Sequence, residues 1–242
     1  VSHAKTLGYT PRSVRTPVAY VDITLNSFVG GSATIAKGTK FTTQVDGSTY
    51  GFVTNSSQTV GPVNGVTRFI NLPIYEGSLV VAKYTVDNSN LDKKYMVTDA
   101  RADTTTLKVS IQNSVSDNTV VSYNLATDIS QVTGTSNVYF LQEVEDGKFE
   151  VYFGDGVVGT KPTDGNIVIL EYIVTNKDKA NGASVFSGTT VAGESDITVA
   201  TLVQATGGAE AETIESIKYN APLDYSSQGR AVTTQDYKTI LP

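Results

Sequence analysis

The sequence predicts a mainly β protein of the α+β class, with two antiparallel β-rich modules and a short helical C-terminal segment. Its 242 residues include 21 glycines, while hydrophobic and charged residues make up only 39% and 17% of the chain. Thr, Ser, Asn and Gly supply the remaining polarity, and with prominent Val and Tyr they favour strands and turns over helices. Apolar and polar side chains alternate with a period of two in several segments, which is typical of half-buried strands.

The first β module is predicted to span residues 1–73. Its strands are expected at residues 18–25, 33–36, 41–45, 50–54 and 66–72. Asp46 and Gly47 separate two of these runs, and both residue types tolerate the positive φ angles of a type I′ turn, which predicts a tight hairpin. The last run is predicted to end at Pro73, because proline cannot donate a hydrogen bond to a neighbouring strand.

The second β module is predicted to span residues 74–190 as an antiparallel meander or sandwich. Its strands are expected at residues 79–86, 94–97, 107–111, 120–123, 138–144, 148–153 and 167–174. Asp146 and Gly147 lie in the clearest hairpin of the chain, between two runs rich in aromatic and β-branched residues. The run at 167–174 is almost continuously apolar, which predicts a strand buried on both faces.

Residues 191–242 are predicted to hold a returning strand at 196–204, which can complete the first module, and then a helix-loop-helix. The first helix is expected at 210–220, because its acidic residues precede its lysine as the helix dipole favours, and Pro222 is placed to stop it. A second helix begins after the Thr cap at 233–234, and the chain ends about two turns later. We therefore expect the sequence to be a piece of a longer protein.

The composition excludes several classes of function. With no cysteine, the chain has no disulfide, thiolate nucleophile or cysteine-bound zinc. His3 is the only histidine, so a multi-histidine metal centre is impossible and a Ser-His-Asp triad is disfavoured. The net charge of −6 argues against a nucleic-acid grip, and no apolar run is long enough to span a membrane. We expect no catalysis, cofactor, metal, nucleic acid, membrane or small-molecule substrate.

Two motifs suggest chemistry but have simpler interpretations. Residues 153–159 resemble a phosphate-binding glycine loop, yet a strand rather than a helix follows, so a structural hairpin turn is expected. Several aspartates lie near turns without the spacing of a calcium loop, and turn chemistry is their expected role. The separation of two acids that glycoside hydrolysis needs cannot be obtained from a sequence.

The C-terminal segment supplies the candidate contact residues. Arg230 follows a glycine turn, and a local ion pair with Asp224 or Asp236 is favoured over a contact with a partner. Tyrosines often serve as anchors in protein interfaces, because they bury a large surface and keep a polar tip. The predicted interface residues are Tyr219, Pro222, Tyr225, Arg230 and Tyr237.

The order of several blocks resembles the baseplate J-like family of contractile-tailed bacteriophages, with most likeness to the C-terminal portion of T-even-type baseplate wedge proteins. The matching blocks are residues 7–12, 35–39, 75–77, 153–172, 207–218, 220–222 and 229–237. Each block alone is weak, since Gly and Asp turns are common, but the ordered set is fairly specific and spans most of the chain.

The resemblance implies a structural role without catalysis or cofactor. Such a protein would self-associate, with dimer contacts inside a ring, bind other baseplate wedge proteins and help to control sheath contraction. It would lie in the tail baseplate of the virion after assembly in the host cytoplasm. The alternative is a carbohydrate-binding or glycan-degrading tail module, because aromatic strands can stack on sugars.

Overall fold

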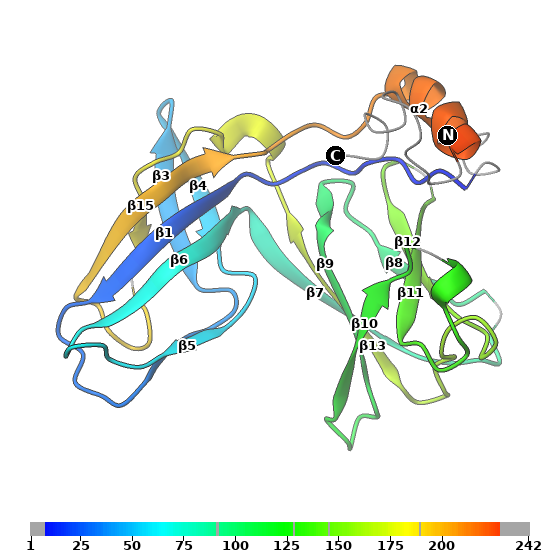
Figure 1. Cartoon of the computed structure of the whole chain (residues 1–242), viewed down its shortest axis with the longest axis horizontal. Coiled ribbons are helices and arrows are strands. Elements are labelled where there is room, and N and C mark those ends of the chain that lie inside the picture. Colours follow the sequence, from blue (N-terminus) through cyan, green and yellow to red (C-terminus); the bar gives the residue numbers. More distant parts are fainter. Residues whose placement is uncertain (1–7, 91, 128, 145, 189, 228–242) are drawn as a thin grey trace.

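A computed structural model describes residues 8–90, 92–127, 129–144, 146–188 and 190–227 (Figure 1). It confirms the mainly β fold with a short C-terminal helix. Two large sheets lie side by side along the long axis of the molecule, and the helix lies beside the second sheet. The helical elements are η1 (Ile129–Gln131), η2 (Lys177–Ala180) and α2 (Ile214–Ser227).

The first sheet combines strands from both ends of the chain. Its order is β14 (Ser187–Gly188), β3 (Lys40–Val45), β4 (Ser48–Val53), β6 (Thr67–Glu76), β1 (Val18–Leu25) and β15 (Ile197–Thr206). β15 pairs with β1 in an antiparallel ladder, as expected of the returning strand. A separate two-stranded ladder joins β2 (Ala33–Ile35) to β5 (Gln58–Val60). The buried faces enclose a core that includes Phe41, Phe52 and Phe69.

The second sheet is formed by consecutive chain between the two parts of the first. Its order is β7 (Ser78–Thr85), β13 (Ile167–Val174), β9 (Ala102–Gln112), β10 (Val120–Leu125), β11 (Val138–Glu143), β12 (Phe149–Phe153) and β8 (Tyr95–Val97). The sheet is not purely antiparallel, because β10 and β11 pair in parallel. Its two edge strands approach each other where the Tyr84 hydroxyl donates a 2.7 Å hydrogen bond to the Met96 carbonyl.

Local predictions from turn chemistry and burial are confirmed. Asp46 and Gly47 have φ angles of 49° and 79°, and the flanking Val45 and Ser48 pair directly, as in a two-residue type I′ hairpin. Asp146 and Gly147 likewise have positive φ angles between β11 and β12. β13 is buried on both faces, since Leu170 and Ile173, on opposite faces, are both fully buried.

Both proline boundaries were wrong. β6 continues through Pro73 to Glu76, because β4 pairs with β6 only at Tyr75 and Glu76 and leaves one side of the strand at Pro73 without a neighbour. α2 continues through Pro222 to Ser227. The helix also begins at Ile214 rather than Glu210, because the residues before it pair with the N-terminal segment.

Sheet membership changes between Glu76 and Ser78 and again after Val174. The division of the chain into modules at 1–73, 74–190 and 191–242 stays a prediction. Among the described residues, no helix has the length and apolar character needed to cross a membrane.

Candidate functional site

The two sheets are joined by hydrogen bonds to a fully buried carboxylate. Glu76, the last residue of β6, has no solvent-exposed surface. Its Oε2 accepts hydrogen bonds from the Thr175 hydroxyl at 2.6 Å and the Asn176 backbone N–H at 2.8 Å, and its Oε1 accepts one from the Asn176 side-chain amide at 2.7 Å. The end of the first sheet is thereby bonded to the chain that leaves the second sheet, because Thr175 directly follows β13.

Asp103 on β9 forms the second link. Its Oδ2 accepts the backbone N–H of Thr16 at 2.8 Å, and its Oδ1 accepts the N–H and hydroxyl of Thr105. The Thr16 hydroxyl donates in turn to the Glu76 carbonyl at 2.6 Å. We call Thr16, Glu76, Asp103, Thr175 and Asn176 the inter-sheet joint. It holds the N-terminal segment, the first sheet and the second sheet together.

One salt bridge and one hydrogen bond add to the contacts of the joint. Lys37, from the loop after β2, forms an ion pair with Glu171 on β13. Lys108 on β9 donates to the Asn55 carbonyl, and burial lowers the pKa of Lys108. Both contacts join a loop outside the second sheet to one of its strands, so together with the joint they oppose a change of the angle between the two large sheets.

The N-terminus of α2 is built against the N-terminal segment. The backbones of Arg15 and Ala209 exchange hydrogen bonds of 2.9 and 3.1 Å, and the Glu212 N–H donates to the Arg12 carbonyl at 3.0 Å. Thr213 caps the helix, since its Oγ1 accepts the Ser216 N–H at 3.2 Å. These bonds explain why residues 209–212 lie outside the helix.

Glu212 is the centre of the polar network at this end of the helix. Its carboxylate accepts bonds from the Tyr9 hydroxyl, the Arg12 N–H, the Ser216 hydroxyl and the Asn220 amide. Burial acts to raise the pKa of Glu212, but these hydrogen bonds outweigh it and the pKa is lowered. Burial, followed by the hydrogen bond to Glu212 and its charge, raises the pKa of Tyr9 to about 12.

The predicted interface residues on α2 lie on its solvent side. Tyr219 and Tyr225 are each 62% exposed, and Pro222 is also exposed. On the other side of the helix Ile217 and Ala221 pack against Tyr9. Arg230 and Tyr237 lie outside the described residues. The structure therefore brings three of the five predicted residues to one exposed helix, and their role in an interface stays a prediction.

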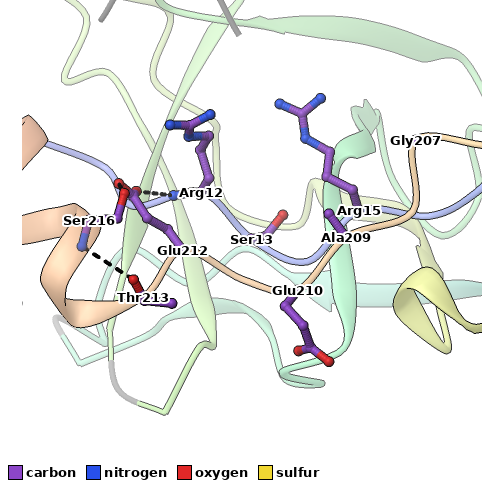
Figure 2. Close-up of a pocket in the computed structure, with 9 residues that line it drawn as sticks. All are labelled: Arg12, Ser13, Arg15, Gly207, Ala209, Glu210, Glu212, Thr213 and Ser216. Atoms are coloured by element: carbon purple, nitrogen blue, oxygen red, sulfur yellow. Dashed lines mark hydrogen bonds between the residues drawn. The ribbon is translucent and has the colours of Figure 1, made fainter.

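A pocket of about 440 Å³ lies between the N-terminal segment and the start of α2 (Figure 2). Figure 2 shows the side chains of Arg12 and Arg15 extending to the same side of their segment, whereas Glu210 extends to the opposite side. Neither arginine was among the predicted contact residues. Asp103, one of the aspartates expected to serve a turn, lies buried inside β9 instead, so that expectation was wrong. The burial of Glu76 was not predicted either, because a carboxylate inside a strand has no local pattern that reports its burial.

The motifs that suggested chemistry form turns. Asp155 in the glycine loop accepts the N–H groups of Val157 and Val158, and no helix follows. The loop is a turn but not a hairpin, because β12 and β13 pair with other strands and not with each other. Asp117 also caps a turn, and the hydrogen bond from Asn113 is the main cause that lowers its pKa to about 2. The described residues hold no cluster of three or more metal-ligating side chains.

The part of the chain around the second sheet is similar to known proteins. Residues 80–185 match the third domain of the bacteriophage baseplate wedge protein gp6 family. Over 132 residues the chain is 33% identical to baseplate wedge protein gp6 of Enterobacteria phage T4. This match covers 44% of this chain and 20% of that protein. The chain thus matches about a fifth of the length of this relative.

A solved structure aligns over nearly the whole chain with a low score. It is a chain of the cryo-EM structure of the anti-feeding prophage baseplate, 6-fold symmetrised, and the alignment covers 99% of this chain and 44% of that one. The sequence identity is 13% and the TM-score is 0.35, so no argument rests on this similarity.

Proposed function

We propose that this chain is part of a phage baseplate wedge protein and forms a rigid assembly segment of the wedge. The premise is the match of residues 80–185 to the third domain of the gp6 family. The family match is the observation that carries this proposal. Its place is the tail baseplate of the virion. The chain would self-associate, bind neighbouring wedge proteins in a ring around the tail and take part in the control of sheath contraction.

The geometry supports a mechanical role without catalysis. An assembly segment must hold its contact surfaces at a constant angle, and the inter-sheet joint provides buried hydrogen bonds that oppose bending. The exposed tyrosines of α2 supply anchors of the kind that dominate protein interfaces. The aspartates in turns are engaged in local hydrogen bonds and serve the fold.

The proposal is tested by measuring the mass of the purified chain by light scattering and its capture of the other wedge proteins of the same phage. We expect self-association and capture of at least one of them. Tyr219→Ala combined with Tyr225→Ala should weaken both, while Tyr152→Ala, a change of an exposed tyrosine on β12, should leave both unchanged.

A strictly monomeric chain that captures no wedge protein would contradict the proposal. Specific binding on a glycan array, in the absence of such capture, would favour the alternative function as a carbohydrate-binding tail module.

A further inference from the structure

Arg12 and Arg15 present two positive charges that the described part of the molecule leaves uncompensated. Among the residues that the structure describes, no carboxylate oxygen lies within the 4.0 Å ion-pair limit of either guanidinium. The other two arginines in the described residues have ion-pair partners, Arg68 in Asp22 at 3.9 Å and Arg101 in Asp99 at 3.1 Å. Arg12 and Arg15 are therefore the two described arginines without an ion-pair partner.

The nearest acidic residues in the pocket are engaged elsewhere. The Glu210 carboxylate forms a 2.6 Å ion pair with Lys177 and extends away from both arginines (Figure 2). Glu212 accepts hydrogen bonds from four different residues, including the backbone N–H of Arg12 but not its guanidinium. Neither carboxylate is therefore available to neutralise the arginine side chains without losing existing bonds.

The backbone that carries the two arginines is held in place. Arg15 exchanges two backbone hydrogen bonds with Ala209, and the neighbouring Ser13 hydroxyl lies 2.9 Å from the Thr104 hydroxyl of β9. The segment is thus anchored both to the start of α2 and to the second sheet. A fixed backbone reduces the conformational entropy that a partner would have to remove on binding.

We propose that Arg12 and Arg15 bind carboxylate side chains of an acidic, extended segment of a neighbouring protein in the baseplate. The guanidinium group presents parallel N–H donors that match the two oxygens of a carboxylate. This inference rests on the proposed function, because it assigns a partner chemistry to a surface of the assembly segment.

The test measures binding of a fluorescein-labelled octaglutamate peptide to the full chain by fluorescence anisotropy. We expect octaglutamate to bind, with an affinity that falls as salt is raised because exposed charges are screened. Arg12→Gln combined with Arg15→Gln should weaken binding roughly tenfold for each arginine removed. Arg12→Lys with Arg15→Lys should give an intermediate loss, since the charge remains but the forked geometry does not.

Arg101→Gln is the matched control, because it removes an exposed arginine that already has an ion-pair partner. It should change the affinity less than twofold. Equal losses in the control and in the double variant would overturn the proposal, as would binding of octalysine or of a DNA octamer at least as tight as that of octaglutamate. Absence of octaglutamate binding to the unaltered chain would overturn it too.

The peptide assay separates this inference from the proposed function. If octaglutamate fails to bind while the chain still captures wedge proteins, only the arginine site is wrong. If octaglutamate binds but the chain is monomeric and captures no wedge protein, the site exists and the proposed function is wrong.

Discussion

The carboxylate of Glu76 is bonded to Asn176 twice, through the backbone N–H at 2.8 Å and the side-chain amide at 2.7 Å. These two residues are 100 positions apart and lie at the two crossings between the sheets. In the described part of the chain no cation forms an ion pair with Glu76, so neutral donors alone satisfy its side-chain oxygens. At Glu76 the connection between the sheets therefore depends on buried hydrogen bonds and not on a salt bridge.

Glu76→Ala should destabilise the protein by about 3 kcal/mol or more, because it leaves the three donors of Thr175 and Asn176 unpaired in a buried site. Glu215→Ala is the control, since its side chain is 82% exposed and its ion pair with Lys218 lies on the surface. The control should cost less than about 0.5 kcal/mol. Urea denaturation measures both values, and equal losses would contradict the structural role of Glu76.

Two buried threonines allow a matched comparison of one hydroxyl group. Thr16→Val removes the 2.6 Å bond to the Glu76 carbonyl and should cost about 1 kcal/mol. The Thr43 hydroxyl is equally buried but has no hydrogen-bond partner among the described residues. Thr43→Val should be neutral or stabilising, because it removes an unsatisfied polar group. Thermal unfolding decides the comparison, and a larger loss for Thr43→Val would argue against the joint.

Because the chain has no cysteine, two introduced cysteines are its only sites for spin labels. The distance between the two labels then reports how the sheets are held relative to each other. Spin labels on Val29→Cys and Val115→Cys, whose native side chains are 99% and 80% exposed, report the distance between loops on the two sheets. We expect one narrow distance distribution by double electron–electron resonance. Asp103→Asn together with Thr16→Val should broaden it. A broad distribution in the unaltered joint, or no change in the variant, would show that these bonds do not restrain the sheets.

Gly77 should not tolerate a side chain. Its φ angle is +112°, and a Cβ atom there would lie 2.1 Å from the Val174 carbonyl oxygen. Gly77→Ala should cost about 3 kcal/mol, from backbone strain and overpacking together. Gly31→Ala is the control, because it has no atom within 4 Å of a Cβ and its φ is not positive, and it should stay within about 0.5 kcal/mol. Chemical denaturation of the pair provides the measurement.

Tyr9 should ionise about two pH units above an ordinary tyrosine. Its folded pKa is raised to about 12, so its contribution to stability is complete below pH 10 and is lost as the pH rises through 12. Glu212→Gln should lower the pKa of Tyr9 towards 10 without reaching it, since burial remains the largest cause. NMR titration of the Tyr9 ring carbon measures this shift, and an unchanged pKa in the variant would show that Glu212 does not act on Tyr9.

Predictions from the sequence succeeded where the cause is local. Asp46 and Gly47 form their turn because both tolerate positive φ angles, whatever the rest of the chain does. The prolines were misread because their effect depends on neighbours. Pro73 remains inside β6 because no β4 residue stands opposite it, and residues 209–212 stay outside the helix because the N-terminal segment pairs with them. Neither β4 nor the N-terminal segment is adjacent in the sequence to the residues whose structure it decides.

The sequence by itself determined the class of the fold, the two tight hairpins and the resemblance to baseplate wedge proteins, since each depends on residue type and short spacing. Only the tertiary structure decided that Glu76 and Asp103 are buried and bonded across the sheets, and that Arg12 and Arg15 share one pocket. The reason is physical: the environment of a charged side chain is made by distant segments that pack around it, and a strand pattern records only which face is apolar.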